Sequence, residues 1–148
     1  MAGCSKDKFS TKPKLSFESI NADEFVSGQD ISIKIKLTDK EGDFSDDESN
    51  PGFKKPYLFV KRFSYLCSAQ DTTITNYPIP AFTSRKDLDA NLIINFTYGI
   101  NDGQYQYFGR SDCAEQRNDS TYLSIWIKDE AGNMSDTINT ATFKLLKD

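Results

Sequence analysis

The sequence has no histidine among its 148 residues. Histidine is the side chain that titrates near neutral pH and the commonest metal ligand in proteins, so its absence excludes histidine-based catalytic triads and histidine metal sites. Carboxylate, lysine or tyrosine side chains would have to carry any reaction alone. The sequence therefore predicts a protein that is not an enzyme and that needs no organic cofactor.

Long apolar runs and basic clusters are also missing. No stretch approaches the roughly 20 apolar residues that a membrane-spanning helix requires. The chain has 18 basic and 22 acidic residues and a net charge of -4. Without a basic stripe to neutralise phosphates, nucleic acid is not an expected partner. The chain has the length of a single domain, and 13% of its residues are aromatic, which favours a packed core over disorder.

Alternating apolar and polar residues predict β-strands along most of the chain. The clearest example begins at Asp30, where Ile31, Ile33, Ile35 and Leu37 share one face, as expected of a half-buried strand. Pro78 and Pro80 confine the strand before them to a sheet edge. Further strands are predicted at 15–20, 57–66, 72–77, 88–98, 121–128 and 138–146, with a short extra one within 104–108. Seven or eight mostly antiparallel strands predict an all-β, immunoglobulin-like β-sandwich over residues 14–148.

An acidic glycine turn occurs twice. Asp39-x-x-Gly42-Asp43-Phe44-Ser45-Asp46 is repeated 90 positions later as Asp129-x-x-Gly132-Asn133-Met134-Ser135-Asp136. In an immunoglobulin-like topology both turns lie at one end. Two alternatives remain open. The residues are good turn formers, in which Asp caps and Gly or Asn takes positive φ. Alternatively, their oxygens bind a calcium ion, with the candidate ligands Asp39, Glu41, Asp43, Asp129 and Asn133.

The N-terminus carries a resemblance to a known family. Ala2-Gly3-Cys4 resembles the end of a bacterial lipobox, and residues 5–13 look like a flexible tether. Together with the D-x-E-G-D and D-x-A-G-N-x-S-D turns, the pattern resembles the small immunoglobulin-like lipoproteins of Bacteroidetes-type bacteria. The resemblance implies that Cys4 is acylated and that residues 1–13 form the anchor and tether. It implies a place in the cell envelope, at the periplasmic or the surface-exposed face of the outer membrane, with the lipid as the only membrane contact.

Short motifs in the same chain bear on modification. Asp71-Thr72-Thr73, Asp119-Ser120-Thr121 and Asp136-Thr137-Ile138 resemble the O-glycosylation signal of those bacteria, although three-residue patterns also recur by chance. The resemblance implies glycans at Thr72, Ser120 and Thr137, all expected at strand edges or in loops.

Three cysteines remain to be assigned. Cys67 follows the predicted strand 57–66, and Cys113 lies before the predicted strand 121–128. These positions fall at the same end of an immunoglobulin-like sandwich, and an exported chain favours oxidation. We therefore predict a Cys67–Cys113 disulfide, with two free thiols as the alternative. Cys4 is then the odd cysteine, which suits lipidation.

Three functions fit this architecture. The leading prediction is a monomeric binding or assembly module that recognises a protein or another envelope component. The second is carbohydrate binding by an aromatic hairpin at Tyr98–Phe108, since tyrosine rings suit sugar faces; the candidate residues are Tyr98, Asp102, Tyr105 and Tyr107. In the alternative interpretation of that stretch, Tyr105 and Tyr107 are ordinary strand residues and Phe108 lies in the core. The third function is a structural spacer. A large exposed apolar patch would favour the protein partner.

Overall fold

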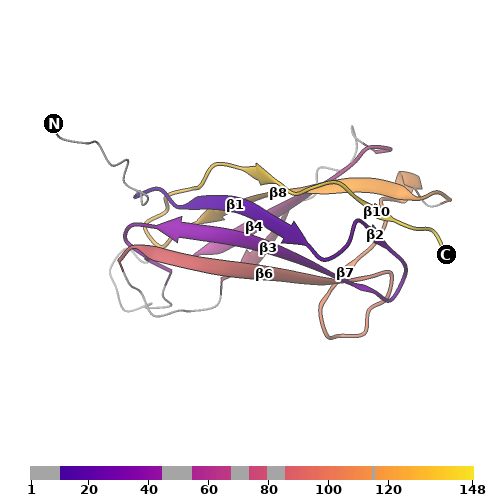
Figure 1. Cartoon of the computed structure of the whole chain (residues 1–148), viewed down its shortest axis with the longest axis horizontal. Coiled ribbons are helices and arrows are strands. Elements are labelled where there is room, and N and C mark those ends of the chain that lie inside the picture. The colour runs from indigo at the N-terminus through magenta and orange to yellow at the C-terminus, as the bar shows by residue number, and fades with distance from the viewer. Residues whose placement is uncertain (1–10, 45–54, 68–73, 80–85, 115) are drawn as a thin grey trace.

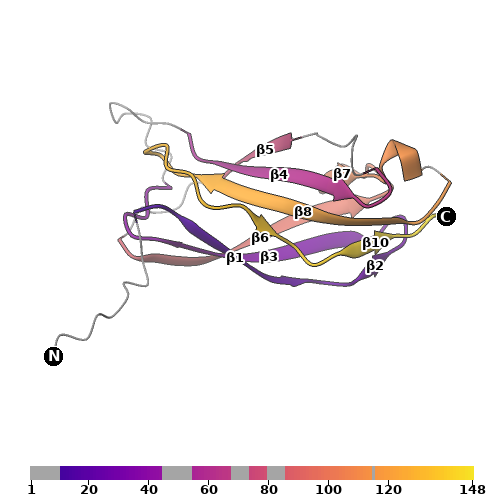
Figure 2. The same cartoon turned by 90° about the horizontal axis from the view of Figure 1, so that it is seen from above.

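The computed structural model describes residues 11–44, 55–67, 74–79, 86–114 and 116–148. Two sheets pack face to face in an elongated sandwich (Figures 1 and 2). The first sheet has the order β1 (Lys14–Ile20), β3 (Asp30–Asp39), β6 (Leu88–Tyr98) and β7 (Gln106–Phe108). The all-β sandwich predicted from the sequence is confirmed.

The second sheet contains the remaining described strands. Its order is β2 (Glu24–Phe25), β10 (Phe143–Leu145), β8 (Asp119–Lys128), β4 (Tyr57–Ser64) and β5 (Ile74–Pro78), with β9 (Ile138–Asn139) also paired with β8. A short 3-10 helix, η1, spans Asp112–Ala114. Described pairings are antiparallel except for β2–β10 and β6–β7. As expected, the proline-terminated strand β5 is an edge strand.

The core lies between the sheets and follows the alternation in the sequence. Ile31, Ile33, Ile35 and Leu37 of β3 are fully buried, and so are Leu123, Ile125 and Ile127 of β8. Burying an aliphatic side chain of this size contributes roughly 1.5–3 kcal/mol relative to exposure. Because both central strands bury every second residue, their register is strongly specified.

The strand predicted at 138–146 is interrupted. Leu123 of β8 bonds to Thr140 in both directions: its N–H donates to Thr140 Oγ1, and its carbonyl accepts from the Thr140 N–H. A side-chain oxygen thus replaces a ladder carbonyl, and the predicted strand divides into β9 and β10. The two-residue strand β2 was not predicted, because two residues are too short to show a period.

The strand at Gln106–Phe108 also differs from the prediction. It runs parallel to β6, so Tyr98–Phe108 is not a hairpin. Phe108 is buried and packs on Phe96, with ring centroids 5.1 Å apart. This agrees with the interpretation that put Phe108 in the core.

Tyr98 is buried in the core, and its hydroxyl donates to Leu146 O at 2.7 Å. We expect Tyr98→Phe to lower the free energy of unfolding by about 1 kcal/mol, because it removes one hydrogen bond and leaves a carbonyl unpaired. Urea denaturation measures the change. Tyr107→Phe, at an exposed ring, is the control and should have no effect; equal losses in both variants would contradict the prediction.

Candidate functional site

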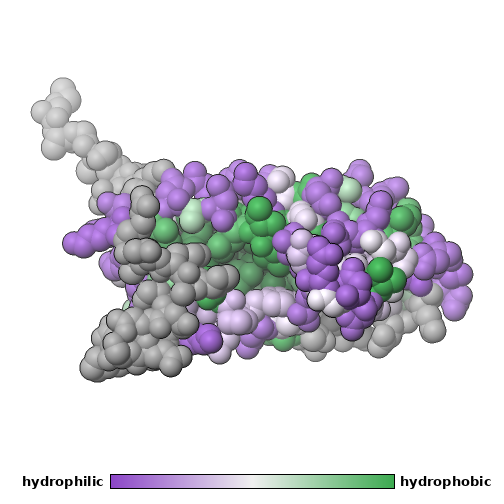
Figure 3. Space-filling view, turned by 90° about the horizontal axis from the view of Figure 1, so that it is seen from below, coloured by the Kyte–Doolittle hydropathy of each residue, from purple (hydrophilic) through white to green (hydrophobic). Residues whose placement is uncertain are grey.

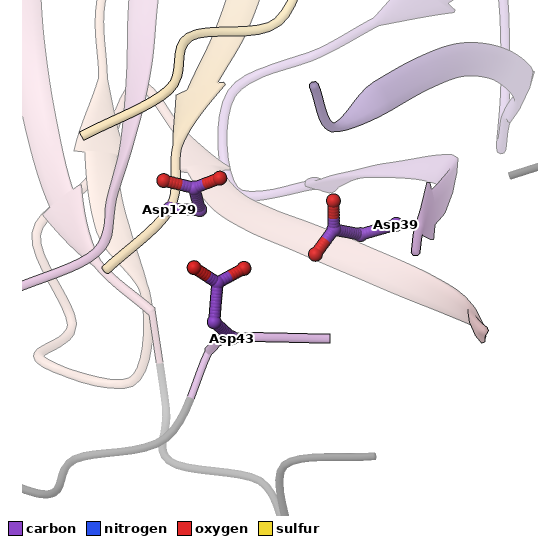
Figure 4. Close-up of side chains that lie close together, drawn as sticks. All are labelled: Asp39, Asp43 and Asp129. Atoms are coloured by element: carbon purple, nitrogen blue, oxygen red, sulfur yellow. The ribbon is translucent and has the colours of Figure 1, made fainter. Parts of the chain in front are cut away.

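The two acidic turns lie together at one end of the sandwich. The first follows β3 and the second follows β8, and the Glu130 N–H donates to Asp43 O at 3.0 Å, which joins them. One carboxylate oxygen from each of Asp39, Asp43 and Asp129 lies within 4.8 Å of the other two. Figure 4 shows the three carboxylates facing one another. We refer to these three residues as the acidic triad.

Turn chemistry explains part of the acidic triad. The Gly42 N–H donates to Asp39 Oδ2 at 2.7 Å, and Gly42 has a φ of 62°. Asp129 accepts from both the backbone N–H and the side-chain amide of Asn133. These contacts orient the carboxylates, as capping Asp residues do in turns.

Turn chemistry leaves two oxygens unexplained. Asp39 Oδ1 and Asp43 Oδ1 are buried and accept no hydrogen bond. Asp39 and Asp129 are both completely inaccessible to solvent. Burial, and next the adjoining Asp43 carboxyl, raise the pKa of Asp39 to about 7, and burial likewise raises the pKa of Asp129. A buried carboxylate without a partner is costly, so this cluster favours a bound proton or cation.

Two of the five predicted metal ligands are not in the acidic triad. Glu41 is exposed at the same turn and contributes no oxygen to the cluster. Asn133 directs its amide N–H to Asp129 Oδ2, so it supports a carboxylate.

A second feature was not predicted, and it lies along β6. β6 pairs with β3 over its whole length, but β7 covers only Phe96–Tyr98 on the other side. Among the described residues, no strand pairs with Asn91–Asn95 on the side away from β3. We call this stretch the open edge.

The backbone of the open edge has unused donors and acceptors. The Tyr98 N–H donates to Gln29 O on the β3 side, whereas the Gly99 N–H donates to Phe108 O on the β7 side. Because backbone groups alternate along a regular strand, Asn91, Ile93 and Asn95 direct their N–H and C=O groups away from β3.

An apolar recess lies beside the open edge, between β6 and β5. It has a volume of about 440 Å³, and none of the described residues in its wall is charged. Figure 3 shows a hydrophobic hollow on this face. Leu92 faces inward yet is only partly buried, because the sheets do not close over it. The apolar wall residues are Leu58, Tyr77, Pro78, Ile79, Leu92, Ile93 and Ile94.

A second hollow continues the recess toward β7. It has a volume of about 340 Å³ and shares Tyr77 and Gln106 with the recess. The described residues of its wall include Arg62 and Arg110 and no carboxylate. The combined groove is therefore apolar at one end and basic at the other.

Ile93 is the residue that the sequence analysis overlooked. It is 63% exposed and lies at the middle of the open edge. The signal was present in the sequence, since Ile93 stands on the polar face of an otherwise alternating strand. Exposed strand edges usually carry charged residues or proline, which block pairing with other chains. Between Asn91 and Asn95 there is neither.

Two of the four residues predicted to bind carbohydrate, Tyr98 and Tyr107, line one hollow of about 370 Å³. Tyr98 is only 3% exposed, so little of its ring is accessible to a ligand. Asp102 accepts from the Gln104 N–H within its own turn. Tyr105 is half-buried, and only Tyr107 presents an exposed ring.

Cys67 and Cys113 are joined in a disulfide with a Cα–Cα distance of 5.9 Å, as predicted. Cys4 and Thr72 lie outside the described residues. Thr137 is exposed just before β9. Ser120, however, is half-buried within β8, which has β4 and β10 as neighbours. It is therefore not at the edge or loop position expected for a glycan.

Comparisons with known proteins give the fold only. No family model matches the chain, and no curated protein does. A solved structure of the Pseudomonas fluorescens alkylpurine DNA glycosylase AlkC, bound to DNA with an abasic site analog, aligns with 93% of this chain at 10% identity and a TM-score of 0.50. The Bacillus subtilis sporulation control protein Spo0M aligns with 93% at 6% identity and a TM-score of 0.42.

This chain spans 31% of the AlkC chain and 50% of the Spo0M chain. In the part of the chain that the structure describes, no helix is both long and apolar enough to cross a membrane.

Proposed function

We propose that this protein is a non-enzymatic, lipid-anchored binding module of the cell envelope, with an immunoglobulin-like sandwich. It captures an extended segment of a partner protein by strand addition at β6. The unpaired, uncharged open edge beside an apolar recess is the observation that carries this proposal. The envelope location rests on the resemblance of Ala2-Gly3-Cys4 to a lipobox.

Strand addition suits the chemistry of the open edge. An added strand gains affinity from main-chain hydrogen bonds and specificity from pockets for alternate side chains. Asn91 and Ile93 offer their backbone N–H and C=O groups, and the recess accepts side chains that point inward. The strand across the recess is β5, an edge strand of the second sheet. It ends at Pro78, which cannot donate a ladder bond. We therefore assign the incoming strand to β6.

The walls of the groove define the partner. The recess is lined by uncharged residues wherever the structure describes its wall, so it suits apolar side chains at every second position of the segment. Arg110 in the adjoining hollow suits a carboxylate at one end of the segment. The partner is thus an extended peptide with alternating apolar residues and an acidic end.

Ile93→Lys tests the proposal. A lysine at the centre of the edge blocks strand pairing, as charged edge residues do in natural sheets. Random 12-residue peptides displayed on phage would be selected on the full chain, and the enriched peptides measured by fluorescence anisotropy. We expect the selected peptides to have alternating apolar residues. Their affinity should fall at least tenfold in the variant, which corresponds to a loss of about 1.4 kcal/mol in binding free energy. Ile100→Lys makes the same change at an exposed isoleucine just beyond β6 and should bind normally.

Peptide backbone substitution supplies an independent readout. Proline or N-methyl residues should abolish binding when they occupy one set of alternate peptide positions and should be tolerated at the other set. The reason is that only every second N–H group of the peptide faces β6. Equal binding by Ile93→Lys and the unchanged protein would overturn the proposal. The carbohydrate alternative would be favoured if the protein bound no peptide but bound a glycan in a panel, and if the double variant Tyr105→Ala/Tyr107→Ala lost that glycan binding. No ligand in either screen would favour the spacer.

A further inference from the structure

Strand addition does not explain the acidic triad, and turn formation leaves Asp39 Oδ1 and Asp43 Oδ1 unexplained. It lies at the end of the sandwich where β3 and β8 end, whereas the recess lies along β6 and β5. We propose that Asp39, Asp43 and Asp129 bind one calcium ion, which joins the turn after β3 to the turn after β8.

The first argument is the convergence of three like charges. One oxygen from each residue lies within 4.8 Å of the others, a spacing that fits oxygens around an ion with Ca–O distances of 2.3–2.6 Å. No described lysine or arginine forms an ion pair with any of the three. A divalent cation would supply the missing positive charge.

The second argument is independent of the clustering. Asp39 is fully buried, its Oδ1 has no hydrogen-bond partner, and its carboxyl group faces the other two (Figure 4). Asp43 Oδ1 is likewise buried and has no hydrogen-bond partner. A capping carboxylate needs only one oxygen for its turn, and Asp39 uses Oδ2 for Gly42. The second oxygen is therefore available for a metal.

Supporting contacts hold the ligands in place. The two Asn133 donors fix the Asp129 carboxylate, and the Glu130 N–H to Asp43 O bond fixes the distance between the turns. Carboxylates that coordinate metals are commonly oriented by hydrogen bonds of this kind. Three carboxylates and water can complete the six to eight oxygens of calcium.

Thermal unfolding and calorimetry on the full chain test the site. The protein is first measured in chelator and then with calcium chloride at up to about 10 mM, which exceeds the usual dissociation constants of extracellular calcium modules. We expect calcium to raise Tm by several degrees. Isothermal titration should give one site per chain. Magnesium should shift Tm less, because it demands a stricter octahedral geometry.

Two variants and a matched control locate the ion. Asp39→Asn should raise Tm in chelator, since it removes one of three mutually repelling carboxyl groups, and should abolish the calcium shift. Asp43→Asn, at a half-buried position, serves if Asp39→Asn does not fold. Glu41→Gln makes the same charge change at an exposed carboxylate in the same turn and should keep the full shift. An unchanged Tm in the unmodified protein would overturn the proposal, as would a shift retained in both Asp variants or an equal shift with magnesium.

Discussion

Replacing both Cys67 and Cys113 by serine is expected to lower the free energy of unfolding by about 4 kcal/mol. The bridge links residues 46 positions apart, and closing a loop of this length restricts the unfolded chain by roughly that amount. For a domain of this size, a loss of 1 kcal/mol lowers Tm by about 2–4 °C, so the expected drop exceeds roughly 8 °C. Urea denaturation of the double variant beside the oxidised protein measures the loss.

A thiol assay provides the control. Denatured, unreduced protein produced without lipidation should show one reactive thiol, that of Cys4, and three after reduction, since the chain has three cysteines. Cys4→Ser should leave the unfolding transition unchanged. Three reactive thiols before reduction, or a double variant as stable as the oxidised protein, would contradict the prediction.

Phe96→Ala is expected to cost about 3 kcal/mol. Phe96 is 1% exposed and touches the rings of Tyr77 at 6.1 Å and Phe108 at 5.1 Å between centroids. Truncating a buried Phe removes the transfer free energy and leaves a cavity, typically 3–5 kcal/mol. We expect the lower end, because Phe96 lines a hollow open to solvent and water can enter.

Ile93→Ala is the matched control for this substitution. It lies on the same strand but on the outer face, 63% exposed, so its truncation should change stability by less than about 0.5 kcal/mol. Denaturant midpoints of the two variants provide the comparison. Equal losses would show that β6 is not oriented as described, with Phe96 inward and Ile93 outward.

The two proposed sites lie on different parts of the molecule, one at an end of the sandwich and the other along its side. Lys12, near the start of the described chain, forms an ion pair with Asp136, just after the second acidic turn. If Cys4 carries a lipid anchor, the end of the sandwich with the acidic triad would therefore be the end nearest the tether. The open edge runs along the side of the sandwich, which leaves it accessible to a partner chain.

Much of the fold followed from the sequence because it depends on local alternation. The β3 pattern Ile31, Ile33, Ile35, Leu37 predicted a buried face, and all four are fully buried. β6 has the predicted bounds, Leu88–Tyr98. The break at Thr140 was not predictable, since it depends on a side-chain oxygen meeting Leu123 on a neighbouring strand.

The candidate sites show the same division. The repeated Asp39 and Asp129 turns and the topology together predicted an acidic end, and the Cys67–Cys113 pairing followed from the same topology. Yet only packing decided that Glu41 is exposed while Asp39 is buried with an unpaired oxygen. Alternation also placed Tyr98 on the face it shares with Phe96, although the carbohydrate prediction treated its ring as accessible.

The sequence by itself determined the strands, the sandwich class, the two turns and the cysteine pair, because each is encoded by spacing along the chain. Only the tertiary structure decided which strand edge stays unpaired, which core residues remain half-covered and which carboxylates converge. Those features depend on where β5, β6 and β7 end relative to one another in space, and no local pattern records where a neighbouring strand stops.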